Sequence, residues 1–161
     1  MSQHNENLRN HLEVDPEALD RLARFIWGTQ YHVGNETSAY WLDHDILVFH
    51  GCDSLYLVCW QSQSLSDAHV AARMLVALGQ AYRKIVGTDC VYRTHLIRLP
   101  TPHLAYLYRG GCANPAVRTI TLYEALAMPT PCCIELRIHA INLDSSSSSE
   151  QFPWPKDFAT P

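Results

Sequence analysis

The sequence has no long hydrophobic run, no excess of positive charge and no apolar N-terminal segment. Its opening stretch, MSQHNENLRNHLEVD, is polar throughout and lacks the apolar core of a signal peptide. No apolar run approaches the roughly 18 residues that a membrane span needs. With 12 Lys and Arg against 16 Asp and Glu, the net charge of -4 offers no positive field to attract phosphates. We therefore expect a cytoplasmic protein that binds neither membranes nor nucleic acids.

Signatures of metal and nucleotide sites are missing as well. The chain has no C-x-x-C, H-x-x-x-H or H-x-H spacing, which would place two ligands on one zinc ion. It has no Gly-rich phosphate loop and no G-x-S-x-G nucleophile elbow. The six cysteines are expected to be thiols, because the chain has no export signal and enough core to fold without disulfides. We predict no cofactor and no bound metal.

The length and composition fit one folded domain with a polar segment at each end. A chain of 161 residues with 47% hydrophobic content is long enough for a single core. We expect a flexible arm over residues 1–14, an α+β domain over 15–143 and a Ser/Pro-rich tail over 144–161. The tail, DSSSSSEQFPWPKDFATP, contains Trp154 but cannot fold alone, so it docks on its own domain or on a partner.

Two helices are predicted from capping residues and hydrophobic spacing. The first, PEALDRLARFIW, follows Asp15 as its N-cap and stops at Gly28. The second and longest helix begins after Ser64 or Ser66 and ends at Gly87. Its core stripe is expected to consist of Ala71, Met74, Leu75, Leu78, Tyr82 and Ile85.

Residues 38–61 change to a β pattern: AYWL, ILVFH and SLYLVCW are separated by the turn-forming DHD and GCDS, which predicts a three-stranded meander. CVYRTHLIRL and HLAYLYRG are expected to form a hairpin. A capping box from Thr121 to Glu124 predicts a short helix, LYEALAM. CIELRIHAI is the last expected strand, with its inward face formed by Ile134, Leu136, Ile138 and Ala140. The order α-β-β-β-α-β-β-α-β indicates an α+β fold with two main helices and a mostly antiparallel sheet of five or six strands.

This order of elements, with the size and acidity of the chain, resembles the small acidic chaperones of bacterial type III secretion. The resemblance covers roughly residues 15–128, and no family motif is matched. It implies a homodimer that binds effector proteins without using a nucleotide. The last strand, the serine-rich tail and the high content of Cys, His and Trp depart from that family. The order is also distantly similar to longin and roadblock modules, which serve as trafficking adaptors.

Hydrophobic residues occupy both alternating faces of the second and third strands, and such strands are covered on both sides by helices or by a partner chain. We therefore predict a non-enzymatic protein-binding module, a homodimer that captures a segment of a partner protein on apolar sheet or helix surface. The expected contact residues are Tyr56, Val58 and Trp60 on the sheet, Val70, Arg73 and Ala77 on the second face of the long helix, and Trp154 in the tail.

Cys52 and His50 carry the main alternative, a cysteine- and histidine-based enzyme or a metal-binding sensor. The two residues flank Gly51 at the spacing that lets both reach one ion, and a cysteine needs a neighbouring base to become a nucleophile. A tight hairpin turn has no pocket that excludes water, which favours a structural turn instead. A third alternative is a structural subunit of a larger assembly, anchored by its aromatic tail.

Overall fold

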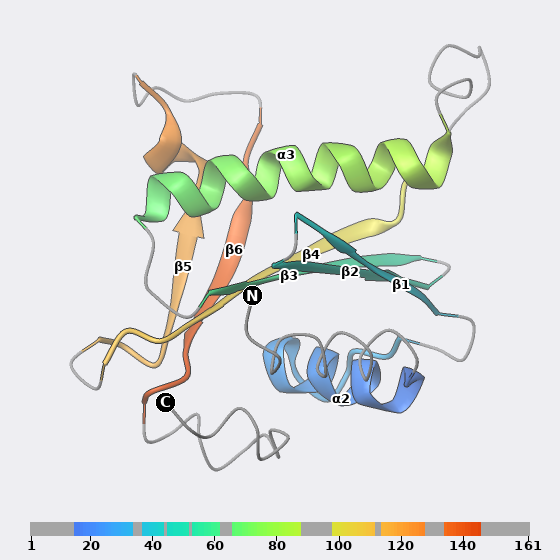
Figure 1. The fold of residues 1–161 in the computed structure, drawn as a ribbon, viewed down its shortest axis with the longest axis horizontal. Coiled ribbons are helices and arrows are strands. Elements are labelled where there is room, and N and C mark those ends of the chain that lie inside the picture. The colour runs from blue at the N-terminus through green and yellow to red at the C-terminus, as the bar shows by residue number, and fades with distance from the viewer. Residues whose placement is uncertain are drawn as a thin grey trace.

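A six-stranded mixed sheet forms the centre of the molecule, with α3 on one face and α2 on the other (Figure 1). Its strands and helices follow the order α2-β1-β2-β3-α3-β4-β5-η2-β6, where η2 is a short 3₁₀-helix. The predicted α+β class, the two main helices and the number of strands are confirmed. This computed structural model describes residues 15–33, 37–43, 45–51, 53–61, 66–87, 98–111, 114–127 and 134–145.

Both α-helices begin and end at the residues that their capping signals predict. Helix α2, Pro16–Trp27, starts after Asp15, whose carboxylate accepts a hydrogen bond from the Glu17 amide at 2.9 Å. Helix α3, Asp67–Val86, starts after Ser66, whose hydroxyl accepts from the His69 amide at 3.4 Å. Gly28 and Gly87 end the two helices with φ of 105° and 74°, a region that costs glycine little.

The sheet has the strand order β1-β2-β3-β4-β6-β5. The predicted meander is confirmed as three antiparallel strands, and α3 then connects β3 to β4, which pair in parallel. Strand β4 also pairs in parallel with β6, and β5 pairs antiparallel with β6 at the edge. The strands are β1 Ser38–Leu42, β2 Ile46–His50, β3 Ser54–Gln61, β4 Thr101–Tyr108, β5 Val117–Thr121 and β6 Arg137–Asn142.

The predicted hairpin of CVYRTHLIRL with HLAYLYRG is corrected by the pairing of β4. Strand β4 pairs with β3 along its whole length, and its residues Ala105–Tyr108 also pair with β6, so both edges of this part of HLAYLYRG are occupied by other strands. Most of CVYRTHLIRL lies outside the described residues, and residues 98–100 are not in a strand. The strand that completes the set is β5, which the sequence pattern did not reveal because its residues are mostly polar and partly exposed.

The Thr121 to Glu124 capping box is confirmed, although the helix that it starts is the single 3₁₀ turn η2, Leu122–Ala125. After it, β6 begins at Arg137 and so starts later than predicted. Leu136, Ile138 and Ala140 are buried as expected, whereas Ile134 is 56% exposed. Ile134 precedes the strand, and the alternation of faces that predicted its burial applies only inside a strand.

The sheet buries hydrophobic side chains on both of its faces. The face beneath α3 includes Val48, Leu57, Tyr106 and Ile138, packed against the helix residues Val70, Ala71, Met74, Ala77, Leu78 and Ala81. The opposite face includes Leu47, Phe49, Tyr56, Val58 and Leu107, packed against the α2 residues Ala18, Leu19, Leu22, Ala23, Ile26 and Trp27. One chain thereby supplies both covers of its central strands.

Both core layers are expected to stabilise the fold. Leu57→Ala, beneath α3, and Leu47→Ala, beneath α2, should each lower the free energy of unfolding by about 2–5 kcal/mol, because each leaves a cavity in a packed layer. Urea unfolding followed by circular dichroism measures both changes. Val117→Ala, at a side chain 60% exposed, is the control and should change the free energy by less than about 0.5 kcal/mol. A Leu47→Ala variant as stable as the control would contradict the packing of α2 on the sheet.

Candidate functional site

Four of the contact residues predicted from the sequence lie in the core. Tyr56 and Val58 are 1% and 2% exposed beneath α2, and Val70 and Ala77 are each 1% exposed between α3 and the sheet. Their expected place on an open surface is therefore corrected, since the chain's own helices cover both apolar faces of β3. Trp60 is partly buried against the α2 layer, and Trp154 lies outside the described residues.

Arg73, the last of the six residues predicted on the sheet and helix, is held in an ion pair. Its guanidinium Nη2 contacts both carboxylate oxygens of Asp45, at 2.6 and 2.7 Å. The Gln61 side chain donates to the same carboxylate, and the Asp45 carbonyl accepts from the Trp60 amide at 2.7 Å. The hydrogen bond that Arg73 donates to Asp45 raises the pKa of Arg73. The arrangement fastens α3 to the β2–β3 pair.

The thiol of Cys59 lies beside this ion pair and is a poor nucleophile at neutral pH. Burial, and secondly the negative charge of Asp45, raise the pKa of Cys59 to about 12, so the thiol is protonated at neutral pH. His50 ends β2, where it pairs with Leu55 and is half-buried, and Cys52 lies outside the described residues. Within the described ranges, no three His, Cys, Asp or Glu side chains come together at a spacing suited to a metal ion.

Aromatic rings form a row on the α2 face of the sheet. Phe49, Tyr56 and His103 are paired across β2, β3 and β4, and their rings stack at centroid distances of 4.8 and 5.0 Å. The Trp27 and Tyr31 rings pack against His103 at 5.9 and 5.0 Å. Burial, and secondly the nearby charge of His139, lower the pKa of His103 below its ordinary 6.5. His103 is therefore neutral at physiological pH.

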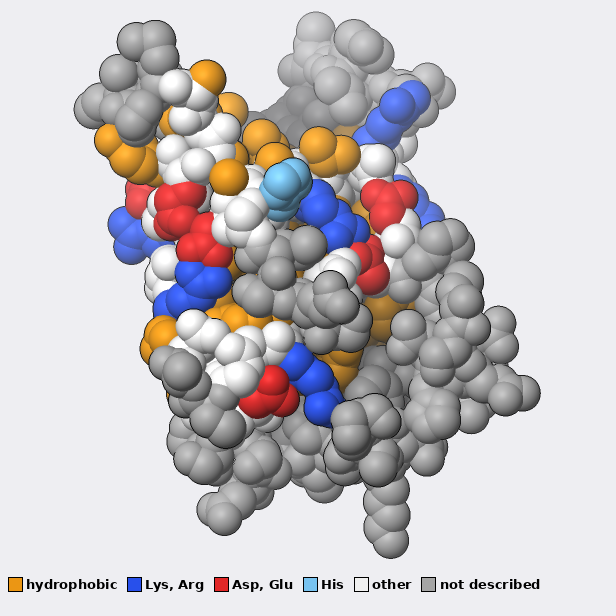
Figure 2. Space-filling model, turned by 60° about the vertical axis from the view of Figure 1, so that its left-hand side comes forward, with side chains coloured by type: hydrophobic (Ala, Val, Ile, Leu, Met, Phe, Trp, Pro, Cys, Tyr) orange, Lys and Arg blue, Asp and Glu red, His pale blue; other side chains and the backbone are white. Residues whose placement is uncertain are grey.

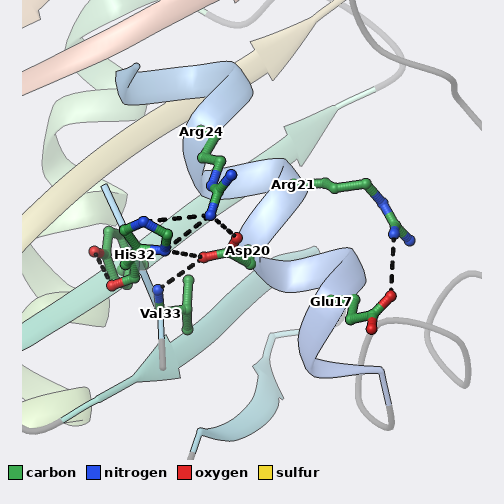
Figure 3. Close-up of polar contacts among 7 residues, drawn as sticks. Glu17, Asp20, Arg21, Arg24, His32 and Val33 are labelled. Carbon is green, nitrogen blue, oxygen red and sulfur yellow. Dashed lines mark hydrogen bonds and ion pairs between the residues drawn. The ribbon is translucent and has the colours of Figure 1, made fainter. Parts of the chain in front are cut away.

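A polar network joins α2 to the segment that follows it (Figure 3). The Asp20 carboxylate contacts Arg24 at 2.8 Å and His32 at 3.3 Å, and it accepts from the Val33 amide at 3.1 Å. The Tyr56 hydroxyl in turn donates to the His32 carbonyl at 3.4 Å. The network holds the segment after α2 against the sheet, a structural role that uses the charges of Asp20 and Arg24.

The exposed side of α3 differs from these clusters, because it carries a stripe of apolar side chains next to the polar residues His69, Gln80 and Arg83. We define the α3 strip as Ala68, Ala72, Leu75, Val76 and Gly79. Leu75 is 37% exposed and Val76 is 58% exposed, although the helical spacing placed Leu75 in the core. The strip contains no charged residue, and α3 itself contacts η2, where Tyr123 is 51% exposed. Figure 2 shows hydrophobic side chains at the top of one face and again lower down, with acidic and basic side chains between them.

The α3 strip had a detectable signal in the sequence. Ala68, Ala72, Leu75 and Gly79 follow one another at spacings of 4, 3 and 4 residues, the pattern of a second helical stripe beside the core stripe. The two stripes are adjacent, so periodicity alone did not separate them. Leu75 belongs to the outer one, and Val70 and Ala77 belong to the core.

No family model, no curated protein and no solved structure matches this chain. The resemblance to secretion chaperones therefore stays a prediction from the order of elements. Among the described residues, neither α2 nor α3 is long and apolar enough to cross a membrane.

The environment of His103 predicts a depressed titration midpoint. In an NMR titration, the ring protons of His103 should shift with a midpoint below 6.5, because burial disfavours the imidazolium form. His139→Gln should raise that midpoint, since it removes the second cause of the lowered pKa. A midpoint at or above 6.5 would show instead that stacking on Tyr56 stabilises the cation, and would contradict this account.

The raised pKa of Cys59 predicts that the protein loses stability at alkaline pH. The unfolded thiol ionises near 9.0 and the folded thiol near 12, so the unfolded state releases its proton first as the pH rises. Unfolding should become easier between these values, by up to about 1.4 kcal/mol per pH unit. Cys59→Ala should remove the contribution of this thiol to the slope of the free energy of unfolding against pH. Urea unfolding at pH 9.5 to 11 measures that slope. Equal slopes for both proteins would mean that Cys59 ionises in the folded state too.

Proposed function

We propose that this chain is a non-enzymatic protein-interaction module whose contact surface is the α3 strip together with η2. The observation that carries the proposal is the exposure of Leu75 and Val76 on a helix whose opposite side already fills the core. Adjacent exposed apolar side chains mark interaction surfaces, whereas single ones are ordinary. The proposed surface replaces the sheet residues expected from the sequence, because those residues are buried.

The shape of this surface suits a helical or extended partner segment. Leu75 and Val76 form its raised centre, and the small residues Ala72 and Gly79 lie on either side of them along the helix. A partner side chain therefore finds room beside a hydrophobic anchor. Tyr123 on η2 adds an aromatic ring with a polar end, a side chain favoured in protein interfaces.

The remaining described side chains support a binding role better than a catalytic one. Arg73 and Arg118 are held by Asp45 and Asp67 in pairs that join α3 to the sheet, and Arg24 is held by Asp20 within α2. A catalytic acid or base needs a free and suitably titrating group, and Cys59 is protonated. The described residues add no group that favours the alternative centred on Cys52 and His50.

Site-specific photo-crosslinking tests the proposal. A benzophenone amino acid placed at Val76 should form protein adducts in cells that naturally express the chain, because this position faces the bound partner. The matched control places the same amino acid at Glu17, whose side chain is 88% exposed on α2 in the opposite layer. Adducts at Val76 should exceed those at Glu17 by at least about ten-fold, and Leu75→Lys should abolish them. Equal yields at the two positions, or no adduct at Val76, would refute the proposal.

A further inference from the structure

We infer that the α3 strip packs against the α3 strip of a second copy of this chain, with the two helices antiparallel about a two-fold axis. The inference rests on the proposed function, because it takes the same strip as the contact surface. It adds the identity of the partner and the orientation of the contact. Three features of α3 support it: the arrangement of large and small residues, the glycine at position 79, and the charges at the two ends.

The strip is complementary to itself when one copy is turned by two-fold symmetry. With the axis between Leu75 and Val76, the Leu75 side chain of each copy lies against Val76 of the other. The same operation places Ala72 against Gly79 of the other copy, so small residues meet on both sides of the large central pair. The two α3 helices are about 30 Å long, at roughly 1.5 Å per residue, and have the length for such a contact.

Gly79 has no explanation within a single copy. It lies inside the 20-residue helix α3, where glycine costs about 0.5–1 kcal/mol relative to alanine. Its φ is not positive, and a Cβ added there would meet no atom within 4 Å. Neither the backbone nor the packing of its own chain therefore requires glycine. The close approach of a second helix does require a residue without a side chain.

Charge favours the antiparallel orientation over the parallel one. The last turn of α3 carries Arg83 and Lys84, and the first turn carries Asp67. The η2 helix lies beside the N-terminal half of α3 and carries the exposed Glu124 (Figure 1). Neither Arg83 nor Glu124 makes an ion pair with any described residue. Antiparallel packing brings Arg83 of one copy near Glu124 of the other, whereas parallel packing would bring Arg83 against Arg83.

The test is the mass of the full chain in solution. Sedimentation equilibrium between about 1 and 200 μM, a range that spans ordinary homodimer affinities, should show reversible association to twice the chain mass of 18.3 kDa. Gly79→Leu should raise the dissociation constant at least about 30-fold, because the added side chain separates the helices. The same change improves helix propensity and enters open space in one copy, so the variant should fold.

Two further variants keep the result decisive. Arg21→Leu adds the same side chain on the exposed part of α2 and should leave the dissociation constant unchanged. Arg83→Glu should weaken the dimer, and adding Glu124→Gln to it should restore part of the affinity, since Gln removes the like charge and keeps the capping box with Thr121. Circular dichroism of each variant checks that the fold is intact. Val76→Arg, at a position 58% exposed, is a second strip variant if Gly79→Leu does not fold.

The possible outcomes separate this inference from the proposed function. A monomer throughout the concentration range, with Val76 adducts to a different protein, would overturn the dimer and leave the interaction module standing. A monomer without such adducts would overturn both. A dimer that Gly79→Leu and Val76→Arg do not weaken would show that the copies meet elsewhere, and would also overturn the inference. Loss of the dimer in both variants, with Arg21→Leu unaffected, would establish it.

Discussion

The fold depends on hydrophobic burial on both faces of the β2–β3–β4 strands. Val48 and Leu57 point toward α3, and Leu47 and Val58 point toward α2, all of them almost completely buried. A sheet with two apolar faces needs two covers, and this chain supplies one helix for each. The parallel pairing of β3 with β4 follows from the same constraint, because α3 crosses the sheet between these strands. The other features of the molecule are arranged around this three-layer centre.

Polar contacts at the rims then set how the layers are oriented. The pairs of Arg73 with Asp45 and of Arg118 with Asp67 join α3 to β2 and β5. These contacts fix the rotation of the helix about its axis, and the rotation decides which side chains face the sheet. At the far end of β6, the fully buried Asn142 bonds to the loop at Gly110 and Gly111 through both of its side-chain atoms. Arginine and asparagine therefore act here as positioning groups within the fold.

The buried titratable groups of this fold are in their neutral forms. Cys59 is protonated and His103 is neutral at physiological pH, each mainly because it is buried. The stacking row of Phe49, Tyr56 and His103 adds packing to the α2 layer. On α3, an apolar strip centred on Leu75 and Val76 stays exposed beside the polar residues His69, Gln80 and Arg83. That contrast between committed polar groups and an uncommitted apolar strip is the physical basis for proposing a binding role.

Local signals determined the α+β class, the meander and the helix ends, because a cap such as Asp15 or Ser66 acts within three residues of itself. Tertiary structure decided the neighbours of β4 and the rotation of α3. The sheet edge at which β4 pairs depends on strands far away in the chain, and no local pattern encodes that choice. Leu75 was predicted in the core and lies outside it, because two adjacent stripes share one helical period. Only packing against the sheet decided which stripe is buried and which is exposed. The position of the candidate site follows from that choice.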